Sequence, residues 1–186
     1  VEHACYIAMK LCEGLTYAHE LCGTDGAPLE IIHRDMSPPN VLITKHGEVK
    51  IVDFGIAKAQ NALIQTRVGI IKGKIAYMAP EQARGEPVDR RADIFAVGVM
   101  LWEAATGKRP WEGLPELAVM KRLLTGELPT PRSVKPDISP ALEAIILKAT
   151  SHDRRDRYAT AAELQAVVEA YIATSGERLQ QRELGL

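Results

Sequence analysis

His33-Arg34-Asp35-Met36-Ser37-Pro38-Pro39-Asn40 is the stretch of this 186-residue chain that decides its fold. Asp53-Phe54-Gly55 follows it, and Ala79-Pro80-Glu81 follows further along. The first stretch puts a carboxylate and an amide in one loop, and the second puts another carboxylate where a strand ends. Such oxygen-bearing side chains are the ligands that Mg²⁺ takes in proteins. Each motif alone is weak evidence, because a loop aspartate also caps backbone amides.

The three motifs together resemble the signature of protein kinases in content, order and spacing. Phosphoryl transfer needs the same parts: a carboxylate that orients the attacking hydroxyl, ligands for magnesium and positive charge near the phosphates. The resemblance covers residues 1–175 and includes three further segments, 93–98, 104–111 and 153–157. The chain is therefore similar to the C-terminal lobe of a bacterial eukaryotic-type (Hanks-type) serine/threonine protein kinase.

The resemblance implies a fold that is mainly α with small β-hairpins, α+β overall, with the N-lobe absent. Residues 1–175 are expected to form this C-lobe of the catalytic domain, and residues 176–186 a polar tail. The residue pattern agrees, because apolar side chains recur at helical spacing over residues 1–22. Other expected elements are a hairpin of 41–43 and 49–52, a β-branched run at 31–32, a buried helix over 94–105, helices over 115–125, 140–149 and after 160, and loops over 107–113 and 129–136.

Three helix starts carry capping signals. Ser139 before Pro140 is typical of an N-cap followed by a first-turn proline. Pro115 also suits the first turn of a helix. Thr160 and Glu163 form a capping-box pattern, in which the hydroxyl and the carboxylate each accept a hydrogen bond from a free backbone amide.

The resemblance implies a role for each motif residue. Asp35 is implied as the catalytic base that accepts the proton of the substrate hydroxyl. Asn40 and Asp53 are implied as the magnesium ligands, and Leu42 as the residue that packs under the adenine ring. The implied cofactors are therefore ATP and Mg²⁺, and the implied substrate is a serine or threonine of a protein.

Other residues are implied as architectural rather than catalytic. His33 and Phe54 would stack on each other in the hydrophobic column of the lobe. Asp93 would accept hydrogen bonds from backbone amides of the catalytic loop. Glu81 would form a buried ion pair with Arg157, and loss of either partner of such a pair costs roughly 3–5 kcal/mol.

Two positions depart from the family pattern. Serine/threonine kinases carry a lysine where this chain has Ser37, and a threonine where it has Lys74. Our hypothesis is that the charge has been exchanged, so that Lys74 reaches over Ser37 and supplies positive charge beside Asp35. The alternative is a surface lysine and a neutral loop serine in a weakened enzyme. Residues 37–39 do not resemble the corresponding loop of tyrosine kinases, and this favours serine/threonine specificity.

The activation segment is expected between residues 56 and 78. Its phosphorylatable hydroxyls are Thr66 and Tyr77, and Tyr77 belongs to the expected peptide-binding stretch. A phosphate on Thr66 would pair with Arg34 and order the segment. The alternative is an unphosphorylated segment held by packing alone.

The nucleotide-covering parts of a kinase have no counterpart in this sequence. It contains no Gly-x-Gly-x-x-Gly and no strand-borne lysine, since Lys10 falls in a helical stretch. The chain begins at Val1 rather than Met, which predicts an excised domain or a fragment. We expect negligible kinase activity from this chain alone, because nucleotide positioning would be lost.

Two functions are compatible with these observations. The first is a protein kinase whose N-lobe lies upstream, and the intact Asp35, Asn40 and Asp53 favour it. The second is a non-catalytic C-lobe that binds partners through its peptide groove, as a pseudokinase does. A small-molecule phosphotransferase is disfavoured, because residues 79–81 and the activation segment serve a peptide substrate.

The composition excludes several other classes. Hydrophobic residues make up 46% of the chain, charged residues 25%, and the formal net charge is −1. This balance argues against binding to nucleic acid or to a membrane surface, and the longest apolar run, residues 94–102, is too short to cross a bilayer. We expect a cytoplasmic protein with reduced cysteines and with no membrane segment within this chain. Whether regulatory domains lie beyond either end of the chain is left open by the sequence.

Overall fold

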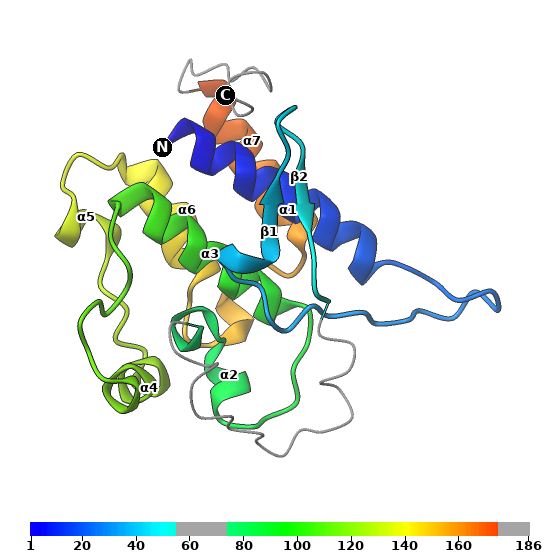
Figure 1. The fold of residues 1–186 in the computed structure, drawn as a ribbon, viewed down its shortest axis with the longest axis horizontal. Coiled ribbons are helices and arrows are strands. Elements are labelled where there is room, and N and C mark those ends of the chain that lie inside the picture. Colours follow the sequence, from blue (N-terminus) through cyan, green and yellow to red (C-terminus); the bar gives the residue numbers. More distant parts are fainter. Residues whose placement is uncertain (55–73, 175–186) are drawn as a thin grey trace.

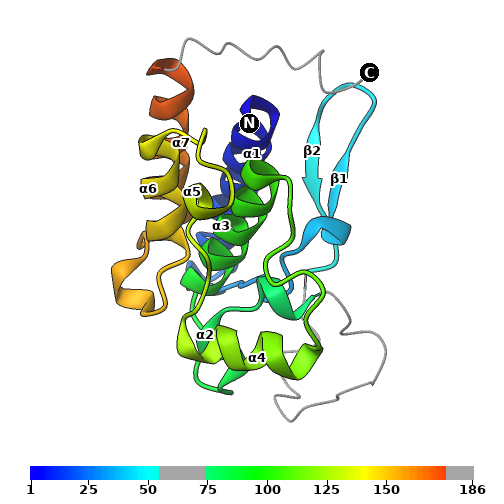
Figure 2. The ribbon, with the colours of Figure 1, turned by 90° about the vertical axis from the view of Figure 1, so that its left-hand side faces the viewer.

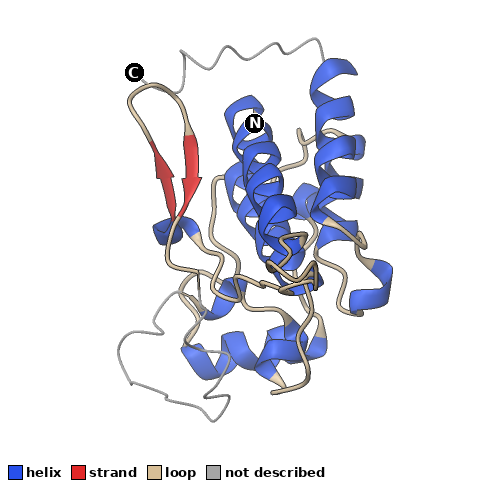
Figure 3. Ribbon diagram, turned by 90° about the vertical axis from the view of Figure 1, so that its right-hand side faces the viewer, coloured by secondary structure: helices blue, strands red, loops and turns tan. Residues whose placement is uncertain are grey.

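The computed structural model describes residues 1–54 and 74–174, and these residues form a mainly helical structure with one two-stranded sheet (Figures 1 and 3). In order, the elements are α1 (Glu2–His19), η1 (Pro38–Asn40), β1 (Val41–Ile43), β2 (Val49–Ile51), η3 (Ile75–Tyr77), α2 (Pro80–Ala83), α3 (Arg91–Thr106), α4 (Glu116–Thr125), α5 (Pro131–Val134), α6 (Pro140–Ala149), η4 (Arg154–Asp156) and α7 (Ala161–Thr174).

Helix α3 is the centre of the fold and packs against α1, α6 and η3. It is apolar around almost its whole circumference, and its fully buried side chains include Ile94, Val97 and Trp102. The predicted all-round burial of this helix is therefore confirmed. At Gly98 the helix crosses the end of α6 so closely that a Cβ would lie 2.8 Å from Ala149 Cβ. The crossing therefore requires glycine at this position.

Helix α1 lies along α7, so that the first and last described helices are neighbours (Figure 1). Its predicted apolar stripe is confirmed, because Ala8, Leu11 and Leu15 are buried. The sheet is an antiparallel hairpin in which Val41 pairs with Ile51 and Ile43 with Val49. This hairpin, also predicted, stands beside the helical body and continues directly from the loop that contains the first motif (Figure 2).

Two expectations about secondary structure are wrong. Residues 31–32 form no strand, since in the described part of the chain β1 and β2 pair with each other and with no other segment. The stretch 129–136, expected as a loop, contains α5. Thr130 stands before this helix in extended conformation and Pro131 occupies its first turn, where the fixed φ of proline favours a helical start.

The capping predictions are largely confirmed. Ser139 caps α6, since its Oγ accepts a hydrogen bond from Leu142 N at 3.2 Å. Thr160 Oγ1 accepts from Glu163 N at 3.1 Å, but the Glu163 carboxylate accepts from Ala159 N at 2.9 Å rather than from Thr160. Pro115 precedes α4 at its N-cap, one position before the expected first turn. Its extended ψ of 150° keeps it outside the helix.

Candidate active site

Asp93, in the first turn of α3, holds the loop that carries Asp35. Its Oδ2 accepts a hydrogen bond from His33 N at 2.8 Å, and its Oδ1 accepts one from Arg34 N at 2.9 Å. The carboxylate is buried, so these charge-assisted bonds are shielded from water. The predicted contact between Asp93 and the loop amides is confirmed.

His19 is a third partner of Asp93 that sequence reasoning missed. Its Nε2 lies 2.8 Å from Asp93 Oδ2, and both side chains are almost fully buried. Its Nδ1 is the one buried side-chain nitrogen or oxygen without a hydrogen-bond partner among the described residues. The sequence offers only a weak signal for this contact: a histidine in the last turn of the helix that precedes the loop.

His33 is a packed structural residue. Its Nδ1 accepts a hydrogen bond from Asp35 N at 3.2 Å, and its Nε2 lies 2.9 Å from the carbonyl oxygen of Val52. One neutral tautomer, with the proton on Nε2, satisfies both contacts. Its ring also lies 4.6 Å from that of Phe54, centroid to centroid, and this confirms the predicted stacking.

Asn40 and Asp53 lie at the same end of the hairpin. Val52 N donates to the carbonyl oxygen of Asn40 at 3.0 Å, which brings the residue before Asp53 against the loop. The Asn40 amide is oriented by Nδ2, which donates to the carbonyl oxygen of Asp35 at 2.7 Å. This bond engages only the nitrogen end of the Asn40 amide. Asp53 is exposed and has φ of 57°, a left-handed conformation that is strained for a residue with a side chain.

Lys74, the other residue of the proposed charge exchange, reaches Asp35. Its Nζ lies 2.9 Å from Asp35 Oδ2, and the two side chains are 32% and 18% exposed. Ser37 is buried, and its hydroxyl donates to the carbonyl oxygen of Asp35 at 3.4 Å. The described contacts thus include a cation beside this carboxylate, although the catalytic loop itself carries none at position 37. What this cation does in catalysis stays a prediction.

The predicted ion pair between Glu81 and Arg157 is confirmed and is bidentate. Arg157 Nη1 and Nη2 donate to the two Glu81 carboxylate oxygens at 2.7 and 2.8 Å. Arg157 also donates to three backbone carbonyls, and its guanidinium carbon lies 4.8 Å from the centroid of the Phe95 ring. Because every part of this buried charge pair has a partner, it fixes α2 against α3 and η4.

Tyr77 is the one of the two candidate phosphorylation sites that the structure describes. Its ring is buried, and its hydroxyl donates a hydrogen bond to Glu103 of α3. Burial raises the pKa of Tyr77, and the hydrogen bond to Glu103 raises it further. The hydroxyl is thereby kept as a neutral donor. Thr66 lies outside the described residues, as does most of the expected activation segment.

Leu42 lies on β1 opposite Lys50 and is 51% exposed. Its side chain is thus accessible to a ligand, but its predicted contact with adenine stays a prediction. Among the described residues, no group of three or more histidine, cysteine, aspartate or glutamate side chains is arranged to hold a metal ion. The described helices also include none that is long and apolar enough to span a membrane.

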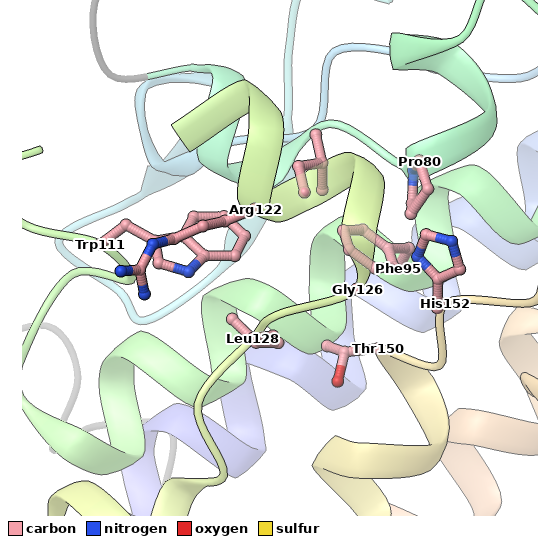
Figure 4. A pocket seen from close by; sticks show the side chains of 9 residues that line it. Pro80, Phe95, Trp111, Arg122, Gly126, Leu128, Thr150 and His152 are labelled. Carbon is pink, nitrogen blue, oxygen red and sulfur yellow. The ribbon is translucent and has the colours of Figure 1, made fainter. Parts of the chain in front are cut away.

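A small gap lies beneath α2 and α4 (Figure 4). Pro80 of α2 and Phe95 of α3 line one side, and Trp111 and Leu128 line another. Its volume of about 10 Å³ is close to that of one water molecule, so the gap is a packing defect rather than a ligand site. Around it, Trp111 Nε1 donates to the carbonyl oxygen of Glu127 at 3.0 Å, which fastens the loop after α4.

Comparison with known proteins gives one family. Residues 2–169 match the family model described as protein kinase domain. The tyrosine-protein kinase MasK of Myxococcus xanthus (strain DK1622) is 50% identical over 167 residues, which are 90% of this chain and 26% of that protein. The serine/threonine-protein kinase PrkC of Bacillus subtilis (strain 168) is 36% identical over 153 residues, 82% of this chain and 23% of that protein. The serine/threonine-protein kinase PknB of Mycolicibacterium smegmatis is 38% identical over 164 residues, 86% of this chain and 25% of that protein. The chain thus spans about a quarter of the length of these relatives.

Proposed function

The chain belongs to the protein kinase family, and from that premise we propose that it carries the catalytic and peptide-binding side of an ATP-dependent protein kinase. The observation that carries the proposal is the constellation around Asp35. The side-chain amide of Asn40 donates to the backbone carbonyl oxygen of Asp35, and the ammonium group of Lys74 donates to the Asp35 carboxylate. Asp53 follows at the end of the hairpin.

In this proposal Asp35 orients the hydroxyl of the protein substrate and accepts its proton. Lys74 holds positive charge at the place where the family keeps a loop lysine. It would keep the carboxylate of Asp35 in one orientation and offset negative charge that develops on the transferring phosphoryl group. Ser37, being buried and neutral, would contribute only to the conformation of the loop.

The residues present fit a magnesium ion. The available atoms are Asn40 Oδ1 and the Asp53 carboxylate, which are hard oxygen donors of the kind that Mg²⁺ takes. A site with two protein ligands is also typical of Mg²⁺, which keeps waters and substrate phosphates as its remaining ligands. When bound with ATP, the ion neutralises charge on the phosphate oxygens. Leu42 would supply an apolar surface for the adenine ring.

The proposed acceptor is a serine or threonine of a protein. The ordered α2, held by the ion pair of Glu81 and Arg157, supports a peptide substrate. Residues 37–39 support serine/threonine specificity, as do the names of two of the three relatives above. The third relative is named a tyrosine kinase. Phosphoamino-acid analysis of the products decides between the two residue classes.

We further propose that an N-lobe outside these 186 residues covers and positions the nucleotide. The purified chain alone would then transfer little or no phosphate. A second function, a non-catalytic interaction module, is compatible with one observation: α2 on the peptide side is held by the ion pair of Glu81 and Arg157, which does not involve Asp35. In that case the chain would bind peptides without any dependence on Asp35.

The test compares the purified chain with a chimera. In the chimera, the stretch of the Myxococcus xanthus relative that immediately precedes the matched region is joined to Val1. We expect the chimera to transfer phosphate from radiolabelled ATP to a generic protein substrate, with Mg²⁺ required. Asp35→Asn should abolish transfer, and the matched control Asp137→Asn, at an exposed loop aspartate, should not. A folded chimera without activity, or activity that survives Asp35→Asn, contradicts the proposal.

A further inference from the structure

Arg34, the residue before Asp35, has a strained backbone. Its φ is 64°, in the left-handed region that residues with a Cβ rarely adopt. Such a conformation costs energy and persists only where surrounding contacts determine it. This conformation also turns the chain between His33 and Asp35, so the direction in which the Asp35 side chain points depends on the conformation of Arg34. The groups that hold Arg34 therefore control the position of the Asp35 carboxylate.

The two peptide groups of Arg34 are held from two different elements. On one side, Arg34 N donates to Asp93 Oδ1 at 2.9 Å, in the first turn of α3. On the other side, the carbonyl oxygen of Arg34 accepts a hydrogen bond from Gln82 Nε2 at 2.9 Å, in α2. The first contact follows from the family resemblance, whereas the second joins the loop to the helix that follows Ala79-Pro80-Glu81.

The orientation of the Gln82 amide is determined by its partners. The Arg34 carbonyl requires a donor, and Ala79 N, which lies 3.1 Å from Gln82 Oε1, requires an acceptor. A glutamine satisfies both at once, with one end on the catalytic loop and the other on the start of α2. The preceding residue, Glu81, fastens the same helix to Arg157. The contacts thus run without a break from η4 through α2 to the residue before Asp35.

We propose that Gln82 is a positioning residue for Asp35, an inference that rests on the function proposed above. Its amide holds the peptide between Arg34 and Asp35 in the strained turn. It also ties the catalytic loop to α2, so that the base and the peptide-binding segment keep one relative position. Holding two reacting groups in a fixed arrangement is a large part of catalysis by phosphotransferases. Loss of the tether should therefore lower kcat more than it raises the KM for peptide.

A purely structural role, capping of α2 through Ala79, is the competing explanation, and two substitutions separate it from the proposal. Gln82→Glu keeps an acceptor for Ala79 N but cannot donate to the Arg34 carbonyl. Gln82→Met has a similar length and loses both contacts. If Gln82 only caps α2, the glutamate variant should behave as the unsubstituted protein. The matched control is Gln165→Glu, which introduces the same charge on α7.

The first measurement uses the 186-residue chain and needs no kinase activity. Hydrogen exchange is followed for the amides of Arg34 and Asp35, in a peptide that covers residues 31–36. We expect exchange to be about fivefold faster or more in Gln82→Glu and Gln82→Met, since one hydrogen bond that holds the turn is lost. Gln165→Glu should leave the exchange unchanged. Equal exchange in Gln82→Glu and the unsubstituted chain overturns the tether.

The second measurement uses the chimera defined above. We expect kcat to fall by about five- to tenfold in Gln82→Glu, with the peptide KM changed by less than about twofold and with the melting temperature nearly retained. A kcat that is unchanged while exchange at residues 34–35 has risen overturns the positioning role. If the chimera is inactive without any substitution, the proposed function fails, and the exchange experiment still decides on the tether.

Discussion

Lys74 Nζ lies 2.9 Å from Asp35 Oδ2, although 39 positions separate the two residues in the sequence. Lys74 leads into η3, whose buried Ile75 and Tyr77 fasten it to the body of the protein. In the charge exchange that we propose, Lys74 takes the place of the cation that serine/threonine kinases carry on the catalytic loop. The position of Lys74 beside Asp35 depends on the packing of η3.

We expect Lys74→Ala to lower kcat of the chimera by roughly 100-fold, because a preorganised positive charge beside the reacting groups is lost. Lys74→Arg should retain most activity. Restoring the family arrangement, with Ser37→Lys in the Lys74→Ala background, should recover at least part of the loss. Lys121→Ala, at an exposed lysine of α4, is the control. Unchanged phosphate transfer by Lys74→Ala would show that this lysine is only a surface residue.

The ion pair of Glu81 and Arg157 should be the most sensitive point for stability. Either Glu81→Gln or Arg157→Met leaves a buried charge without its partner, and we expect the free energy of unfolding to fall by about 3–5 kcal/mol. Urea unfolding of the 186-residue chain, followed by circular dichroism, measures this loss. The exposed pair of Lys10 and Glu13 offers a contrast, since Glu13→Gln should cost less than about 1 kcal/mol. Comparable losses at both pairs would contradict the view that the buried pair of Glu81 and Arg157 is the more important one for stability.

Burial of Cys12 should make stability depend on alkaline pH. Burial raises the pKa of the Cys12 thiol from 9.0 to about 12. The unfolded chain therefore ionises this thiol first, so its contribution to stability is complete below pH 9 and is lost as the pH rises toward 12. We expect the unfolding free energy to decline over this range and to decline less steeply in Cys12→Ala. An identical slope in both proteins would exclude the effect.

Burial should also determine which of the three cysteines react with a thiol reagent. Cys5 and Cys12 are buried, whereas Cys22 is exposed. Because the thiolate is the reactive form and needs access to the reagent, we expect iodoacetamide to modify Cys22 alone in the folded chain at pH 8. Mass spectrometry of tryptic peptides measures the sites, and the chain in urea, in which all three should react, is the control. Early modification of Cys12 in the folded chain would contradict its burial.

Gly98 and Gly14 provide a matched pair of helix-interior glycines. A Cβ at Gly98 would meet Ala149 Cβ and Thr150 Cγ2 at 2.8 Å, so we expect Gly98→Ala to destabilise the protein by about 1–3 kcal/mol. A Cβ at Gly14 would meet only the end of the Ile51 side chain, at 3.1 Å, which can move. There the better helix propensity of alanine should offset the contact. Thermal unfolding of Gly98→Ala and Gly14→Ala measures the difference in stability between the two variants. Equal stability would show that α3 and α6 are loosely packed at Gly98.

Much of the candidate site could be predicted because its residues belong to short motifs. Asp35 and Asn40 are five residues apart in one loop, and Asp93 opens a helix whose apolar character is evident from the sequence. The partners of these residues were harder to predict. The contact of Lys74 with Asp35 was reached only as a hypothesis, through two departures from a family pattern. His19 and Gln82 were missed, because a histidine at a helix end and a glutamine after Ala79-Pro80-Glu81 carry no signal of a distant partner.

The sequence by itself therefore determined the family, the helices with a clear apolar period, the hairpin and the cap at Ser139. These features depend on residues that are near one another in the chain, so local pattern is sufficient to predict them. Only the tertiary structure decided which side chains hold the catalytic loop. Lys74 and Gln82 reach it from segments that follow it by many residues, and His19 reaches Asp93 from the end of α1, which precedes the loop. Such contacts arise from the way in which helices pack, and no local pattern encodes the distances between them.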